Sequence, residues 1–260
     1  MDSDRQRIEE DLRGQLAGEV CCDDLHVQLY ASDASVYEIR PLGVVRPRHA
    51  ADVAATVRYA AENQSQLHPR GAGSGLAGES LGPGLIVDFS RYMTKVLDAG
   101  RSDAVRVQAG VVLDQLNRTL QKQQRHFGPD PANSAVTTMG SVVAIDASGS
   151  RRLAYGSARD HVVELDVVLA DGREVTFSRT RVAGPGVDWQ QSPVEYLASG
   201  VAAICREHGE AIAAQGQLQA PNRCGYRLDD VLIDDQVDLA RLLVGSEGTL
   251  GLITSAVLTT

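Results

Sequence analysis

The pattern of apolar and polar positions in the first hundred residues predicts a small sheet covered by a helix. Residues 50–62 carry apolar side chains at helical spacing, and short apolar runs at residues 44–47, 67–70 and 85–89 predict strands. The order strand, helix, strand, loop, strand indicates a first α/β unit. We expect this unit to close at the polar turn of residues 98–103.

A second unit is predicted to follow. Residues 105–109 alternate apolar and polar side chains as a half-buried strand does, and residues 111–124 have the spacing of an amphipathic helix. Residues 162–170 and 173–177 predict two strands joined by an Asp-Gly dipeptide, which suits a tight hairpin turn. The second unit is therefore expected to contain antiparallel sheet.

Further elements are predicted from signals at their ends. Ser192 is followed by Pro193, and Glu195 stands three residues on, which is the pattern of a capping box. We expect a helix from there to about residue 214. A shorter helix is expected at residues 237–243 and a strand at residues 250–258.

Two long stretches lack such signals. Residues 178–191 contain Gly-Pro-Gly and are predicted to be a surface excursion within a domain. Residues 127–156 have the pattern of neither a helix nor a strand. Together the elements predict an α+β protein of two lobes, with a glycine-rich turn in each.

Composition and charge narrow the class of protein. The 260 residues are 43% hydrophobic and 23% charged, enough for a sizeable core in one large or two smaller domains. The formal net charge of −9 opposes attraction to nucleic acid or to an anionic membrane. An anionic ligand would have to be bound by local backbone N–H groups and individual arginines.

The cysteines and the first residues bear on localisation. Cys21, Cys22, Cys205 and Cys224 form neither a CxxC pair nor a disulfide framework, so we expect reduced thiols in the cytoplasm. The acidic start lacks the basic region and apolar run of a signal peptide, and no segment has the length of a membrane span. Through a longer parent protein the chain could also be peripheral to the inner face of a membrane.

The glycine-dense loop after the strand at residues 67–70 is the strongest chemical signal. Residues 73–78 satisfy GxGxxG, but a Rossmann dinucleotide site requires a helix directly afterwards, and Gly-Pro-Gly at residues 82–84 opposes one. This argues against a Rossmann NAD dehydrogenase. Glycine lets backbone N–H groups approach an anion closely. The loop is therefore predicted to cradle phosphate without a Rossmann fold.

Four segments together carry a resemblance to a known family. They are residues 69–78, the GPDP motif of residues 128–131 with the TMGS motif of residues 138–141, residues 155–161, and the glycine turn of residues 244–253. In this order they resemble the FAD-binding domain of the vanillyl-alcohol oxidase / p-cresol methylhydroxylase (PCMH-type) superfamily. The branch that the sequence resembles most is that of FAD-linked D-lactate and glycolate dehydrogenases.

The resemblance implies a fold and a domain organisation. The PCMH-type FAD-binding fold has two α/β lobes, a small mainly parallel sheet followed by a larger antiparallel or mixed sheet with flanking helices. We expect residues 1–32 to be an N-terminal helical extension and residues 33–260 to be the FAD-binding domain. Lobe one would span about residues 33–100 and lobe two about residues 101–260. The substrate cap domain of the family is not in this sequence.

The resemblance also implies the residues that contact FAD. The first loop would hold the pyrophosphate through backbone N–H groups, the second segment would pass the flavin ring and ribityl chain, and the last turn would close over the dinucleotide. Val163 would meet the adenine end, although Val163 and Ile253 also suit a strand core, and Glu247 also suits a solvated turn. The implied residues are Arg70, Gly71, Ala72, Gly73, Ser74, Gly75, Leu76, Pro129, Asp130, Pro131, Ala132, Thr138, Gly140, Ser141, Ala144, Val163, Glu247, Gly248 and Ile253.

The sequence departs from the family pattern at several positions. Members that attach the flavin covalently often have a histidine in the first loop, whereas here the nearest is His68, so we expect non-covalent FAD. Ser141 replaces a common glycine. Ile145 and Asp146 stand where many relatives have an asparagine, so no contact is assigned to them. Residues 222–228 resemble another family segment near the flavin, often with a lysine where Pro221 stands here.

Other chemistry receives little support. Asp160 and His161 could be proposed as part of a hydrolase triad, but no GxSxG elbow accompanies them, and adjacent strand residues point to opposite faces. His161 is expected to start a strand. The other histidines lack the spacing of metal ligands, so no metal is predicted.

The resemblance implies an oxidoreductase that acts on a D-2-hydroxy acid such as D-lactate or glycolate. Hydride would pass from the substrate α-carbon to flavin N5. In the family the catalytic and substrate-binding residues come largely from the cap, so the catalytic residues are not assigned and the isolated fragment is expected to be inactive. A downstream iron–sulfur domain or another electron acceptor would be the partner. The alternative is a non-catalytic flavin-binding or assembly subunit of a larger complex.

Overall fold

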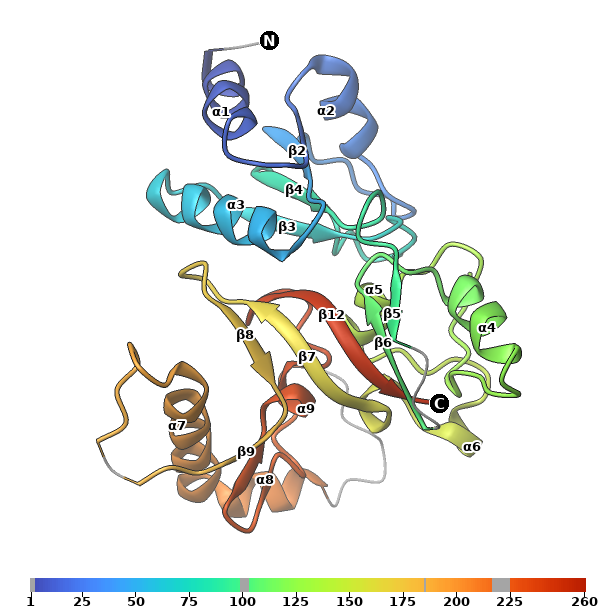
Figure 1. Ribbon diagram of the computed structural model, residues 1–260, viewed down its shortest axis with the longest axis vertical. Coiled ribbons are helices and arrows are strands. Elements are labelled where there is room, and N and C mark those ends of the chain that lie inside the picture. Colours follow the sequence, from blue (N-terminus) through green and yellow to red (C-terminus); the bar gives the residue numbers. More distant parts are fainter. Residues whose placement is uncertain (1–2, 99–102, 185, 217–224) are drawn as a thin grey trace.

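Two lobes, each built on a sheet, make up the protein (Figure 1). The computed structural model describes residues 3–98, 103–184, 186–216 and 225–260. The predicted α+β class is confirmed, with a small mainly parallel sheet first and a larger antiparallel sheet after it.

The first sheet has the strand order β1-β2-β4-β3. Its strands are β1 (Glu19–Cys21), β2 (Gly43–Arg46), β3 (Leu67–Arg70) and β4 (Leu85–Asp88). The last three, which are predicted from their apolar runs, pair in parallel, and β1 joins β2 antiparallel. All four residues of β4 are buried, as expected for a central parallel strand.

Helices cover both faces of this sheet. They are α1 (Ser3–Arg13), α2 (Asp24–Tyr30) and α3 (Ala50–Glu62). The bounds of α3 are those predicted from its apolar spacing, and α3 lies between the first sheet and the second lobe (Figure 1). Arg58 of α3 donates to the carbonyl of Gly172 in the second lobe at 3.0 Å, so the helix also joins the two lobes.

The first 32 residues are built into this lobe. They contain the two helices α1 and α2 and also β1, a strand where only helix is expected. Ile8 and Leu12 are buried in the lobe core. The buried carboxylate of Asp52 accepts from the backbone N–H of Ala17 at 2.9 Å and from that of Arg48 at 2.8 Å, which ties this segment to the start of α3.

The second sheet is antiparallel throughout, in the order β5-β6-β12-β7-β8. Its strands are β5 (Val96–Asp98), β6 (Ala104–Gln108), β7 (Val162–Val168), β8 (Glu174–Phe177) and β12 (Leu252–Thr259). The predicted hairpin β7–β8 is present, with Gly172 at φ +80° in its turn. The last strand along the chain, β12, lies in the middle of the sheet.

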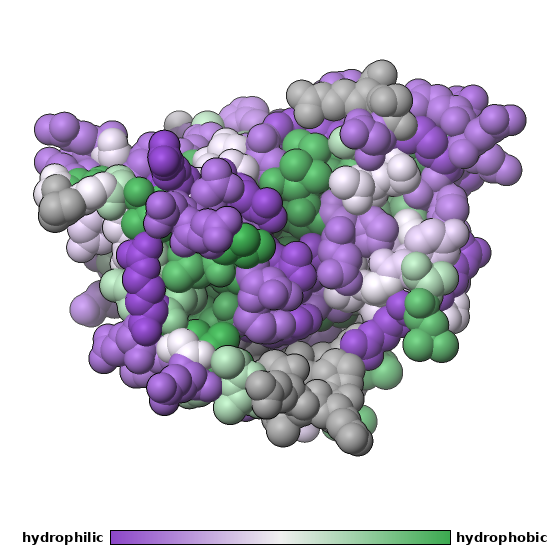
Figure 2. Space-filling view, turned by 90° about the horizontal axis from the view of Figure 1, so that it is seen from below, coloured by the Kyte–Doolittle hydropathy of each residue, from purple (hydrophilic) through white to green (hydrophobic). Residues whose placement is uncertain are grey.

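Short helices and the chief core of the protein flank this sheet. The helices are α4 (Leu113–Gln121), α5 (Met139–Ala144), α6 (Arg152–Tyr155), the 3-10 turn η1 (Ala158–Asp160), α7 (Pro193–Glu207), α8 (Gly209–Gly216) and α9 (Leu239–Leu243). Leu116 and Leu120 of α4 and Met139 of α5 are fully buried. Polar side chains cover most of the face in Figure 2, with smaller apolar areas between them.

Three sequence-based expectations for this lobe are wrong in part. Residues 178–191 contain a strand, β9 (Arg179–Arg181), which pairs with β11 (Gln236–Asp238), itself paired with β10 (Leu232–Ile233). Val237 belongs to that strand, and α9 begins later because Asp238 caps it. Residues 127–156 do contain two helices, each too short for its spacing to stand out.

The predicted capping box at Ser192 does not form. The Ser192 side chain makes no capping hydrogen bond, although α7 does begin at Pro193. The helix also breaks at His208, and α8 restarts at Gly209. A capping box is found at η1 instead, where the Asp160 side chain accepts from the backbone N–H of Ser157 at 2.9 Å.

One buried ion pair ties η1 to the end of α5. Arg159 is 3% exposed, and its Nε lies 3.6 Å from Asp146 Oδ2, too far for a hydrogen bond. Asp146 Oδ1 also accepts from the backbone N–H of Arg159 at 3.0 Å, and Arg159 Nη2 donates to the carbonyl of Val244 at 2.7 Å. Burial lowers the pKa of Arg159, and Asp146 opposes this effect.

Cys21, Cys22 and Cys205 are free thiols, and Cys224 lies outside the described residues. Within the described ranges, no helix is both long and apolar enough to cross a membrane.

Replacing Phe127 by alanine should cost about 3–5 kcal/mol in the free energy of unfolding, because it leaves a cavity in the second-lobe core. Phe127 is 1% exposed and packs edge-on against His161, with ring centroids 5.3 Å apart. Urea denaturation measures the loss. Leu153→Ala is the control, since Leu153 is fully exposed and its loss should stay within about 0.5 kcal/mol. Equal losses would contradict this account of the core.

Asp146→Asn should cost about 3 kcal/mol, because it removes the countercharge with the largest effect on the buried guanidinium of Arg159 while keeping the acceptor oxygen. The matched control is Asp171→Asn. Asp171 has the same two contacts with Arg173, a backbone hydrogen bond at 3.0 Å and an ion pair at 3.1 Å, but its side chain is 38% exposed. The control should lose less than about 1 kcal/mol. Similar losses of unfolding free energy in the two variants, measured by urea denaturation, would show that burial does not determine how much the ion pair stabilises the protein.

Candidate functional site

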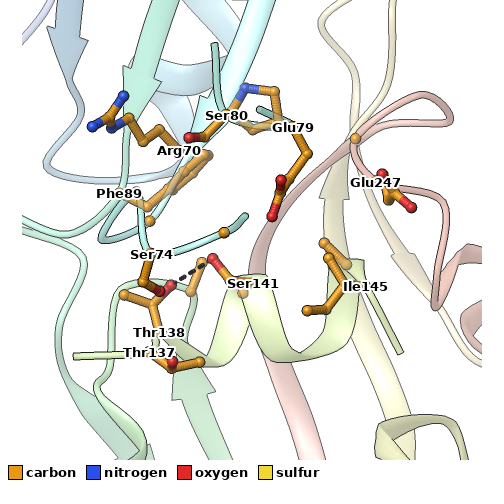
Figure 3. A pocket seen from close by; sticks show the side chains of 18 of the residues that line it. Arg70, Ser74, Glu79, Ser80, Phe89, Thr137, Thr138, Ser141, Ile145 and Glu247 are labelled. Carbon is orange, nitrogen blue, oxygen red and sulfur yellow. Dashed lines mark hydrogen bonds between the residues drawn. The ribbon is translucent and has the colours of Figure 1, made fainter. Parts of the chain in front are cut away.

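A cavity of about 410 Å³ lies where the two lobes meet. Three segments form its walls: the loop after β3 from the first lobe, α5 with the loop before it, and the turn between α9 and β12 (Figure 3). The volume falls in the range of small-molecule sites, roughly 300–1,000 Å³.

The loop after β3 lines this cavity and contains unpaired backbone N–H groups. As predicted, no helix forms between Gly71 and Gly84. Among the described residues, the amides of Gly73, Ser74, Gly75 and Leu76 find no hydrogen-bond acceptor. Backbone amides normally have a partner, and a row of them free at a cavity wall is suited to bind an anion.

The same loop is held firmly from behind. Arg70 turns its guanidinium away from the cavity (Figure 3) and donates from Nη2 to the carbonyl of Ser32 at 2.9 Å. Its guanidinium carbon lies 5.1 Å from the centre of the Tyr30 ring. The amide of Ala34 donates to the carbonyl of Gly73 at 3.0 Å. Gly73 has φ +65°, and a Cβ there would lie 2.8 Å from the Arg70 guanidinium carbon, so only glycine fits without strain.

The opposite wall is the start of α5, where the residues are small. Thr138 Oγ1 and Ser141 Oγ are 3.0 Å apart and face Gly71, where a Cβ would lie 2.5 Å from Ser141 Oγ (Figure 3). Gly140 packs directly after β6, since a Cβ there would lie 2.8 Å from that of Ala109. This wall is therefore closely packed.

The turn between α9 and β12 closes a third side. The amide of Glu247 donates to the carbonyl of Ala144 at 3.0 Å, and that of Gly245 to the carbonyl of Val143 at 3.1 Å. Glu247 has φ +52°, and Gly248 packs against Pro69 of β3. Together with the Arg159 contacts, these bonds fix the turn to the end of α5.

The structure brings most of the predicted contact residues to this cavity. Those that line it are Arg70, Gly71, Gly73, Ser74, Gly75, Leu76, Pro131, Ala132, Thr138, Gly140, Ser141, Ala144, Glu247, Gly248 and Ile253. Ala72, Pro129, Asp130 and Val163 do not line it. Asp130 instead accepts from the Ser150 hydroxyl at 2.8 Å, and Val163 lies 47% exposed on β7.

Several lining residues are missed by the sequence analysis. They are Pro69, Glu79, Ser80, Phe89, Ala109, Asn133, Thr137, Ile145, Ala147, Gly251 and Leu252. Pro69, Gly251 and Leu252 lie inside the motifs quoted above, so their positions could have been included. Ile145 reaches the cavity although no contact is assigned to it. Phe89 and Ala109 simply follow buried strands, and only the tertiary fold identifies them.

The Asp160 and His161 side chains have structural partners. His161 follows η1, one residue before β7, close to its predicted place at a strand start. Its Nδ1 lies 3.1 Å from Thr259 Oγ1 and its Nε2 lies 2.8 Å from the Tyr155 carbonyl oxygen. Asp160 serves the capping box at Ser157. In the described part of the chain, no three acidic, histidine or cysteine side chains gather as a metal site would require.

The family-like segment of residues 222–228 is described only from Gly225 onward. The hydroxyl groups of Tyr226 and Thr249 lie 2.8 Å apart, so this part of the segment lies beside the turn that closes the cavity.

Comparison with known proteins gives consistent results. The curated relatives include a D-2-hydroxyglutarate dehydrogenase of Pantoea ananatis, 38% identical over 87% of this chain and 23% of that protein. Another is the glycolate oxidase subunit GlcD of Bacillus subtilis, 28% identical over 88% of this chain and 39% of that protein. The chain thus spans less than half the length of these relatives.

Solved structures show the same fold. A structure of alkyldihydroxyacetonephosphate synthase matches with a TM-score of 0.64 at 20% identity, over 99% of this chain and 41% of that one. A family model described as an FAD binding domain matches residues 41–178, more than half of the chain. The chain therefore belongs to the PCMH-type family of FAD-binding domains, to which its glycine loop and small-residue wall point.

Proposed function

We propose that this chain is the FAD-binding part of a flavin-dependent oxidoreductase that acts on a D-2-hydroxy acid. The observation that carries the proposal is the row of four unpaired amides on a glycine loop at the cavity. The names of the relatives support the substrate class. Because the chain spans 23% to 39% of the length of those named above, the activity would belong to a longer protein.

The described residues fit FAD in chemistry. The amides of residues 73–76 would donate to the pyrophosphate, and the Ser74 hydroxyl could add a donor. The small residues of α5 leave room for a flat aromatic ring, and Ile145 and Leu252 add apolar surface. When bound, FAD supplies a two-electron acceptor for the oxidation of an alcohol.

The role of this chain would be to bind and orient the cofactor. Among the described lining residues there is no histidine, lysine, tyrosine or cysteine, and the titratable ones are Arg70, Glu79 and Glu247. Arg70 is engaged with the carbonyls behind the loop. The base that takes the hydroxyl proton, and the cations that bind a substrate carboxylate, would then come from a cap domain or a partner.

Non-covalent attachment is the form of FAD binding that we propose. His68 is the histidine nearest to the loop, and alternation along β3 places it on the face opposite to Pro69, which lines the cavity. Its ring packs against Gly82 instead, and burial lowers its pKa. The loop itself contains no histidine.

The first experiment is an absorption spectrum of the purified chain with FAD, before and after acid precipitation. Flavin bands that move into the supernatant would support non-covalent binding, whereas flavin that stays with the pellet would contradict it. A chain that takes up no FAD would overturn the proposed function. The longer protein would then be tested with D-2-hydroxyglutarate, D-lactate and glycolate, and no flavin reduction by any of them would argue against the substrate class.

Gly73→Val should reduce FAD binding at least tenfold, because a side chain at φ +65° would distort the loop and push on Arg70. FAD titration followed by flavin fluorescence measures the affinity. The control is Gly186→Val, since Gly186 also has positive φ, +95°, but has open space around it and does not line the cavity. Equal FAD affinity in the two folded variants would contradict the role of the loop.

A further inference from the structure

A carboxylate of the chain itself lies at the edge of the anion cradle. Glu79 Oε2 accepts from the amide of Ala77 at 3.1 Å, directly after the row of unpaired amides. The Glu79 carboxylate also packs so closely on Gly75 that a Cβ at this position would overlap it. In Figure 3 this side chain points into the cavity, toward Ser141.

The absence of a side chain at Gly75 leaves room for the Glu79 carboxylate. Gly75 does not have positive φ, so its backbone does not require glycine. The three atoms nearest to a Cβ at Gly75 all belong to the Glu79 carboxyl group. The missing side chain at Gly75 therefore makes the space that the carboxylate fills.

No cation of the described cavity wall neutralises this carboxylate. Arg70 is the sole basic residue that lines the described cavity, and its guanidinium binds the carbonyls of Tyr30 and Ser32. No ion pair of Glu79 occurs among the described residues, and Glu247 adds a second negative charge to the wall. A diphosphate that enters the cradle would meet a like charge.

We infer that Glu79 is an internal competitor of the FAD diphosphate: in the free chain its carboxylate lies at the edge of the cradle, against Gly75 and the Ala77 amide, and has to move away as the cofactor binds. The inference rests on the proposed FAD function. Glu79 is exposed and belongs to a loop, so rotation of its side chain can vacate the cradle without unfolding the lobe. The cost of that displacement, and the repulsion that remains, lowers FAD affinity.

The test is a fluorescence titration of the chain with FAD, comparing wild type with Glu79→Gln. Glutamine keeps the length of the side chain and an oxygen that can accept from the Ala77 amide, and removes the charge. The dissociation constant should fall about fivefold, because the variant removes a negative charge beside the position of the diphosphate. The difference should shrink at 1 M salt, where screening acts within about 3 Å.

Glu62→Gln is the matched control. It changes the net charge equally, and Glu62 is an exposed residue at the end of α3 that does not line the cavity. Its FAD affinity should equal that of wild type. A second variant, Glu79→Ala, removes the carboxylate altogether and should bind FAD at least as tightly as Glu79→Gln.

Three results would overturn the inference. Unchanged affinity in Glu79→Gln would mean that the carboxylate does not compete. Weaker affinity would mean that Glu79 helps to bind FAD, as an acceptor for a sugar hydroxyl would. Equal tightening in Glu62→Gln would reduce the effect to net charge. If neither wild type nor Glu79→Gln binds FAD, the proposed function itself fails. If both bind FAD with equal affinity, only the inference about Glu79 fails.

Discussion

The site depends on an arrangement that is rare in folded proteins: several adjacent backbone amides have to stay unpaired and yet be held in place. The protein meets it by fixing the loop on its other side. The carbonyl of Gly73 accepts from Ala34, and Arg70 binds the carbonyls of residues 30 and 32. The N-terminal residues, which α1, β1 and Asp52 attach to the first lobe, thus serve as the support of the loop. This arrangement leaves the amide side open without leaving the loop loose.

The second lobe meets the same need with packing. The start of α5 packs through Gly140 against Ala109, the residue after β6. The turn after α9 donates hydrogen bonds to the last carbonyls of α5. Arg159 connects that turn to Asp146, directly after Ile145 at the cavity. Its Nε and Nη1 have no hydrogen-bond partner, so the chain buries an incompletely satisfied cation at this junction. The walls of the cavity are thus held in place by contacts with other parts of the protein.

The sequence predicted those elements that depend on neighbouring residues and missed those that depend on residues far away along the chain. Helix α3 and strands β3 and β4 follow from local periodicity, and the loop after β3 follows from Gly82 and Pro83, which prevent a helix. The failures involve distant contacts. Strand β9 exists because β11 pairs with it, and α9 starts late because Val237 belongs to that pairing. In the site, most lining residues within the motifs were predicted, whereas Glu79 and Phe89 lie outside the motifs and reach the cavity through the fold alone.

The order of the strands has a consequence for synthesis of the protein. The first sheet is complete once residue 88 has been made, so the first lobe can fold while the chain is still growing. The second sheet has to wait for β12, because β12 is its middle strand and the last of its five strands to be made. Until then β6 and β7 each have an open edge of unpaired backbone groups, the kind of edge that invites association between chains. During synthesis the second lobe is therefore exposed to association between chains for longer than the first.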